Sequence, residues 1–108
     1  ELPVIESIKL GAPGCISATA NINSSDISKV IDFCHKKDWD KAEDLHKKVK
    51  KVRLLFQDYA PIPAQKSLLT RKTGNKVWSN VRPPLISMSK EKSDELANKL
   101  NDQFGYSF

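Results

Sequence analysis

The stretch Gly11-Ala12-Pro13-Gly14-Cys15-Ile16-Ser17-Ala18-Thr19-Ala20-Asn21 lies near the start of the 108-residue chain and decides how the rest is interpreted. A short run of small and apolar residues is entered through two glycines and left through Thr-Ala-Asn. This pattern predicts one buried β-strand over about 14–18, followed by a turn. A strand needs neighbours for its backbone hydrogen bonds, and no second strand is indicated. We therefore expect the last strand of a sheet whose other strands lie outside this chain.

Helical patterns occupy most of the remaining sequence. Apolar spacing and capping residues predict a helix at 2–10 that ends at Gly11, and a second from Ser24-Ser25-Asp26 to Lys36-Lys37. A third helix is predicted at about 39–58 and is capped by Asp38. A fourth is predicted at 63–73, where it begins at Pro63 and ends at Gly74, and the last helix is capped by Ser89. Residues 75–87 are expected to be irregular.

Two apolar stripes mark the inner faces of the middle helices. Ile27, Val30 and Ile31 form one stripe, and Leu45, Val49 and Val52 form the other. We expect both stripes to be partly exposed in this chain, since their cover would lie outside it.

Composition narrows the class of protein. The net charge of +5 permits an acidic partner without demanding one. No apolar run approaches the ~20 residues that span a membrane, and the first residues lack a signal-peptide core. We expect no membrane partner and a cytoplasmic location.

Cys15 on the strand and Cys34 on a helix face are expected to be reduced, buried thiols.

Residues of catalytic type are scattered and do not form a recognisable centre. His35 and His46 lie on different predicted helices, and metal sites need three or four converging ligands, so no metal and no cofactor is expected. No catalytic residue is assigned within the chain. The acids from Asp38 to Asp44 suit a helix start. The lysine-rich helix fits a solvated face, and we expect no nucleic acid; Lys66 is expected to be structural.

Four segments together resemble the dihydrodipicolinate synthase / N-acetylneuraminate lyase family. Residues 11–21 resemble its eighth-strand motif, usually G-x-x-G-x-I-S-x-x-A-N, and 59–66 resemble its N-P-I-P-x-K segment. Residues 38–46 are similar to the helix after that strand, and Trp78 with 81–85 looks like the C-terminal finish. Ala60 stands where many members carry Asn, so no role is carried over to this position.

This resemblance implies the C-terminal portion of a class I aldolase or lyase on a (β/α)₈ TIM barrel. Such enzymes form a Schiff base between a lysine and pyruvate or a related 2-oxo acid, and a whole barrel takes about 250 residues. Residues 1–21 would be the end of the barrel, with its seventh helix and eighth strand. Residues 22–108 would be the last barrel helix and the C-terminal helical extension. The Schiff-base lysine, the catalytic tyrosine and the hydroxyl pair for the carboxylate would precede this chain.

Few functional residues carry over from the family one by one. Ile16 matches the motif isoleucine whose backbone lines the substrate pocket at the C-terminal end of the strand, with Gly14 and Ser17 beside it. The other matched motif positions are Asn21, Pro61 and Pro63. The implied partners are the rest of the barrel, like subunits in a homo-oligomer and a 2-oxo acid. Two other classes stay open: a stand-alone helical interaction module derived from the barrel, and a basic helical nucleic-acid binder.

Overall fold

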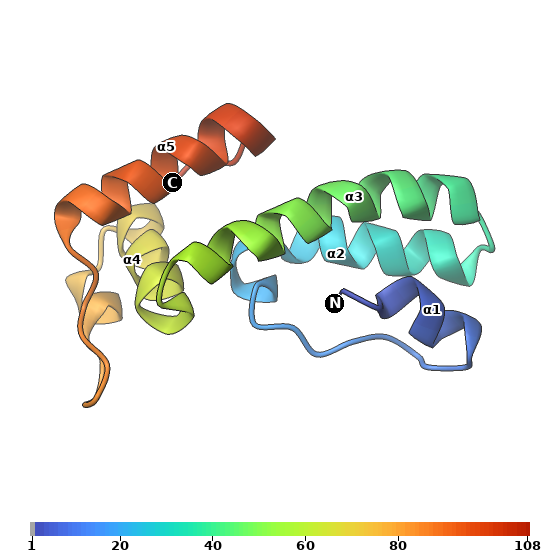
Figure 1. The fold of residues 1–108 in the computed structure, drawn as a ribbon, viewed down its shortest axis with the longest axis horizontal. Coiled ribbons are helices and arrows are strands. Elements are labelled where there is room, and N and C mark those ends of the chain that lie inside the picture. Colours follow the sequence, from blue (N-terminus) through green and yellow to red (C-terminus); the bar gives the residue numbers. More distant parts are fainter. Residues whose placement is uncertain (1) are drawn as a thin grey trace. The chain divides into compact units, whose positions relative to one another are not determined.

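The structure is a computed structural model that describes residues 2–108, and these form helices joined by loops (Figure 1). In chain order the helices are α1 (Val4–Lys9), α2 (Ala20–His35), α3 (Trp39–Leu55), the 3₁₀ turn η1 (Phe56–Asp58), α4 (Pro61–Thr73), the 3₁₀ turn η2 (Lys76–Ser79) and α5 (Lys90–Phe104). The chain divides into two compact units, an N-terminal unit of Glu1–Leu54 and a C-terminal unit of Leu55–Phe108.

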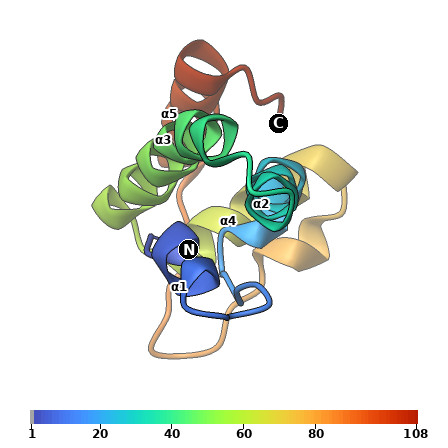
Figure 2. The ribbon, with the colours of Figure 1, turned by 90° about the vertical axis from the view of Figure 1, so that its right-hand side faces the viewer.

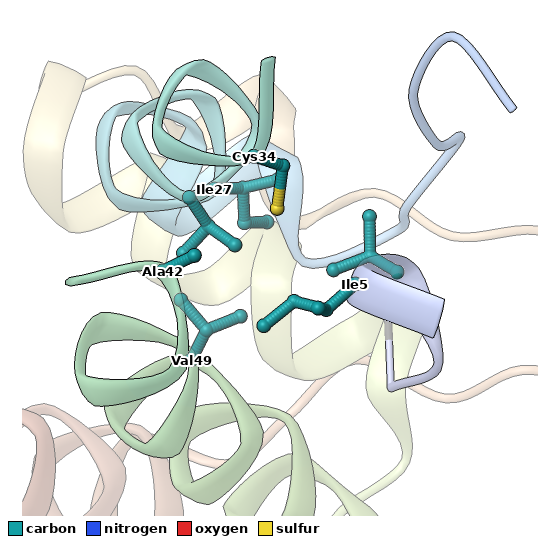
Figure 3. Close-up of a cluster of buried hydrophobic side chains, with 7 residues drawn as sticks. Ile5, Ile27, Cys34, Ala42 and Val49 are labelled. Carbon is teal, nitrogen blue, oxygen red and sulfur yellow. The ribbon is translucent and has the colours of Figure 1, made fainter. Parts of the chain in front are cut away.

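The core of the N-terminal unit lies between α1, α2 and α3. Ile5 of α1, Ile27 and Cys34 of α2, and Ala42 and Val49 of α3 are all buried and point toward one another (Figure 3). Each large apolar side chain buried in this way stabilises the fold by about 1.5–3 kcal/mol relative to exposure. The helical spacing of these residues is therefore explained by contacts within the unit.

The two predicted stripes are mostly buried, which corrects part of the expectation that they would be partly exposed. Val30 is 1% exposed, Val49 1% and Val52 0%, while Ile31 and Leu45 are half-buried. Ile27, Val30 and Val49 belong to one buried cluster with Val4 and Ile5 of α1, and Ile31 and Leu45 pack against this cluster. The most exposed apolar side chains of the chain lie outside the stripes, at Leu10, Ile16, Val77 and Ile86.

The predicted strand over 14–18 is wrong for this chain, because residues 12–17 have no regular secondary structure. A strand is defined by ladder hydrogen bonds to a neighbour, and residues 2–108 contain no strand that could provide them. The segment runs from α1 to α2 as an open arc, visible beside the helices in Figure 2. Cys15 is exposed rather than buried, as is Ile16, whereas Cys34 is buried as expected; both thiols are free.

Helix α2 starts earlier than its sequence signals indicate. It begins at Ala20, and Asn23 interrupts it with non-helical angles of φ −129° and ψ 35°. The Ser24-Ser25-Asp26 signal therefore marks the turn that follows the kink rather than the first helical residue. Lys48 of α3 bridges to Asp26 at 2.9 Å, which joins the two helices beside their apolar contacts.

The C-terminal unit packs α4 against η1, η2 and α5. Its buried side chains include Phe56, Ala64, Leu68, Leu96 and Leu100, each 0% exposed. Helix α4 begins at Pro61, two residues before the predicted start at Pro63. Proline fits the first helical turn because that turn leaves backbone N–H groups without intrahelical partners.

Local capping signals account for several helix ends. The Asp38 carboxylate accepts a hydrogen bond from the Lys41 N–H at 3.4 Å at the start of α3. The Ser89 hydroxyl accepts one from the Lys92 N–H at 3.3 Å at the start of α5. Gly74 ends α4 at φ 71°, a left-handed angle that other residues adopt only at a cost. The long helix closes at Leu55, and its predicted end at 58 is the 3₁₀ turn η1.

Candidate functional site

The segment predicted to reach a substrate pocket lies at the surface of the N-terminal unit. Pro13, Gly14, Cys15 and Ile16 line an open hollow of about 490 Å³. Ile16 is 104% exposed, so its whole side chain is available for contact. Gly14 lies against α2, where an added Cβ would meet the Ile31 Cδ1 atom at 3.9 Å, an ordinary contact distance.

Ser17 and Asn21 build the turn that leads into α2. The Ser17 and Thr19 hydroxyl oxygens are 3.1 Å apart, and the Asn21 amide donates to the Ala18 carbonyl at 2.9 Å. Backbone bonds from Ala20 to Ser17 and from Asn21 to Ala18, both 3.3 Å, complete the turn. Hydrogen bonds of this kind between near neighbours are how Ser, Thr and Asn favour turns.

Pro61 and Pro63 form the first turn of α4 in the C-terminal unit. Pro61 is exposed and Pro63 is buried, and the Ala64 N–H donates to the Ala60 carbonyl at 3.0 Å. Lys66 follows one turn later, half-buried, and its ammonium donates to the backbone carbonyl of Asn80. This contact gives Lys66 a structural role, since it ties α4 to the segment after η2.

The C-terminal unit contains a polar cluster that the sequence patterns do not predict. The Tyr59 hydroxyl donates to Glu95 Oε1 at 2.6 Å, and Lys99 Nζ lies 3.1 Å from the Tyr59 hydroxyl and 2.9 Å from Glu95 Oε1. The i, i+4 spacing of Glu95 and Lys99 is readable on a helix. Tyr59 is 36 residues from Glu95, and no local pattern links them.

The ionisable groups of this cluster shift one another's pKa values. The hydrogen bond from Tyr59, and then that from Lys99, holds the pKa of the Glu95 carboxyl below its usual range. The contact with Glu95 raises the pKa of Lys99, which keeps this amine protonated. Burial, followed by the Glu95 hydrogen bond, raises the pKa of Tyr59. An acid with a lowered pKa and an amine with a raised one form a stable ion pair, not a poised general acid or base.

Metal-ligating residues do not converge in the part of the chain that the structure describes. Among residues 2–108, no three His, Cys, Asp or Glu side chains are grouped so that they could hold a metal ion. Burial raises the pKa of the Cys34 thiol, with Glu43 adding to the effect, so this sulfur stays protonated in the core. The described helices also include none with the length and apolar character needed to cross a membrane.

Comparison with known proteins identifies the family. Residues 3–103 match the model of the "Dihydrodipicolinate synthetase family". A 4-hydroxy-tetrahydrodipicolinate synthase of Methanococcus maripaludis (strain C7) is 31% identical over 104 residues, which covers 94% of this chain and 33% of that protein. The enzyme of the same name from Methanocaldococcus jannaschii is 32% identical with the same coverage. That of Thermodesulfovibrio yellowstonii is 32% identical over 94 residues, or 86% of this chain and 31% of that protein.

The chain belongs to the dihydrodipicolinate synthetase family, as the sequence motifs predicted. It spans about a third of the length of the curated relatives that it matches. No solved structure matches it at a comparable level of significance.

Proposed function

We propose that these residues form the C-terminal part of a Schiff-base aldolase or lyase that acts on pyruvate or a related 2-oxo acid. The parent protein would be a cytoplasmic (β/α)₈ barrel that assembles with like subunits. Family membership supports this proposal, and so does the coverage of a third of each relative, which leaves room for the other strands. Within it, 1–21 close the barrel and 22–108 supply its last helix and the helical extension.

The observation that carries the proposal is the open segment 12–17. Its backbone has no ladder partner among the described residues, and the apolar side chain of Ile16 is wholly exposed. A large apolar side chain held in water forgoes about 1.5–3 kcal/mol that burial would provide. Addition of this segment to the edge of a parallel sheet would satisfy its backbone and cover Ile16.

The chain's own part in the chemistry is then positional. Ile16 lines the pocket for the 2-oxo acid, Gly14 and Ser17 set its direction, and the turn through Asn21 starts the helix behind it. Pro61 and Pro63 turn the extension toward the barrel. The nucleophilic lysine lies on a part of the parent protein outside this chain, so the 108 residues alone do not form the covalent intermediate.

Substitution of Ile16 tests this assignment in two settings. In the 108-residue chain, Ile16→Asp should change stability by less than about 0.5 kcal/mol, because the side chain is exposed. Ile5→Asp is the control for a buried charge and should unfold the chain, since Ile5 is 0% exposed. In the longer parent protein, Ile16→Asp should abolish turnover, because there a charge would sit at a buried strand end.

A milder variant separates pocket lining from folding. Ile16→Ala in the parent protein should leave a folded barrel and raise KM for pyruvate. Leu10→Ala, which removes another exposed apolar side chain, should leave KM unchanged. Normal turnover in the Ile16→Asp parent, with normal KM in Ile16→Ala, would remove Ile16 from the pocket.

A stand-alone helical interaction module is the second candidate. It is favoured by the buried cores that each unit assembles from its own residues, such as Val49 in one and Leu68 in the other. The sequence of the gene upstream of Glu1 discriminates the two proposals. A reading frame that continues upstream with barrel strands eliminates the module.

A further inference from the structure

The C-terminal unit contains a long stretch without acidic residues. Residues 59–90 include no Asp or Glu, yet they carry Lys66, Arg71, Lys72, Lys76, Arg82 and Lys90. An excess of one charge over so much of a small unit attracts ligands of the opposite charge.

Four of these six cations, Lys72 among them, form no ion pair with a carboxylate of the residues that the structure describes. Arg71 and Lys90 share the Asp94 carboxylate at 2.5 and 3.0 Å, and Lys72 reaches the Ser107 carbonyl at 3.4 Å. Lys66, Lys76 and Arg82 form no ion pair with any carboxylate of residues 2–108. Lys66 uses one of its three N–H groups on the Asn80 carbonyl. Both Lys66 and Arg82 therefore keep donors for an anion.

Lys66 and Arg82 meet at a hollow between α4 and the segment that follows η2. The hollow measures about 430 Å³ and is lined by Ile62, Lys66, Asn80, Val81, Arg82 and Leu85. Three of these residues are apolar and two are cations, with no carboxylate among them. Small-molecule sites typically occupy 300–1,000 Å³ and combine an apolar wall with a few charged or polar groups.

Lys66 also lines a second hollow. It measures about 370 Å³ and is lined by Lys66, Asn75, Val77 and Trp78. Trp78 is 43% exposed and Val77 67% exposed, so both present apolar surface beside the amine. Lys66 thus lines both hollows, and each offers apolar surface for the body of a ligand whose charge Lys66 would neutralise.

We propose that the hollow between Ile62, Lys66, Arg82 and Leu85 binds a small organic carboxylate with a compact apolar body. The Arg82 guanidinium suits a carboxylate because its parallel N–H groups match the two oxygens. The remaining Lys66 N–H groups add a second charge-assisted contact, and Ile62 and Leu85 cover the apolar body. This site shares no lining residue with the hollow at Ile16 and does not depend on the proposed aldolase activity.

The experiment is an NMR titration of the ¹⁵N-labelled 108-residue chain with 3-phenylpropionate. We expect saturable shifts of the Asn80, Val81 and Arg82 amides. Two control ligands each lack one half of the probe: acetate has only the charge, and 3-phenylpropanol has only the apolar body. Each should bind at least about tenfold more weakly than 3-phenylpropionate, which corresponds to a loss of about 1.4 kcal/mol of binding free energy. Shifts that do not saturate, or that lie elsewhere in the chain, would overturn the proposal.

Two arginine variants distinguish binding at the proposed site from a general effect of the chain's net charge. Arg82→Gln should weaken 3-phenylpropionate binding by about tenfold, and because the Arg82 side chain is exposed the spectrum should stay that of a folded protein. Arg53→Gln removes the same charge from α3, outside the lining, and should leave the affinity unchanged. Equal weakening in the two variants would show an effect of net charge and overturn the assigned site.

Discussion

Tyr59 shows how one residue can connect two segments of the C-terminal unit. Its hydroxyl lies between Glu95 and Lys99, at 2.6 and 3.1 Å. Glu95 and Lys99 are both solvent-accessible, so water screens their attraction and the gain in stability is small. The measurable consequence is the titration of Glu95 rather than the melting temperature.

Tyr59→Phe should raise the pKa of Glu95 toward its ordinary value of 4.5, since the Tyr59 hydroxyl is the largest cause of the lowering. Lys99 remains in place, so part of the lowering should persist. The measurement is a pH titration of the Glu95 side-chain carboxyl by NMR. Asp94 is an internal control, because its pKa is lowered by Lys90 and Arg71 instead and should not move.

The same substitution changes the pH dependence of stability in a defined direction. A carboxyl whose pKa is lowered by folding stabilises the protein above its unfolded pKa, and this contribution is lost as the pH falls through the folded pKa. Stability should therefore fall with acidification below 4.5, and it should fall less in Tyr59→Phe. An unchanged Glu95 titration in the variant would show that the hydrogen bond does not form.

Among the elements, helix ends reveal where the backbone itself is constrained. Gly74 closes α4 at φ 71°, and its N–H donates to the Thr70 carbonyl at 2.8 Å. Gly14 lies outside the left-handed region, and an added Cβ there finds an ordinary contact at 3.9 Å. The two glycines thus differ in what an alanine would cost.

Gly74→Ala should destabilise the chain by about 1–2 kcal/mol, the cost of a side chain in a left-handed conformation. Gly14→Ala is the matched control and should change stability by less than about 0.5 kcal/mol. Urea unfolding followed by circular dichroism measures both. Equal effects of the two substitutions would contradict the conformational explanation.

Elements governed by nearby residues could be predicted from the sequence. Asp38, Gly74 and Ser89 mark helix ends because a cap depends on the residues within one turn. The strand over 14–18 could not be predicted reliably in the same way, because a strand depends on ladder partners that are distant in sequence, and residues 2–108 supply none. Helix α2 does not start at the predicted Ser24 signal, because it begins at Ala20 and continues across the kink at Asn23.

The candidate site, like the fold, could be predicted only in part from the sequence. The motif match placed Ile16, Gly14 and Ser17 together in one segment, which was expected to be a buried strand; neither its lack of a ladder nor the full exposure of Ile16 follows from the residues themselves. The contacts of Tyr59 with Glu95 and of Lys66 with Asn80 join residues 36 and 14 positions apart. Only the packing of the C-terminal unit brings such pairs together.

For the whole molecule, the central proposal is that the chain belongs to a Schiff-base enzyme whose reactive lysine lies elsewhere. Schiff-base formation needs an amine that is partly deprotonated near neutral pH, so its pKa must be lowered from about 10.4. The contact with Glu95 moves the pKa of Lys99 in the opposite direction. Lys66, which lies beside apolar surface, is already hydrogen-bonded to the Asn80 carbonyl.

Reductive trapping with pyruvate and borohydride tests this proposal most directly, with the modified lysine located by peptide mass mapping. We expect no adduct on the 108-residue chain. The longer parent protein should take up one pyruvate per subunit, on a lysine outside residues 1–108. A stoichiometric adduct on Lys66 or any other lysine of this chain, or no adduct on the parent protein, would contradict the proposal.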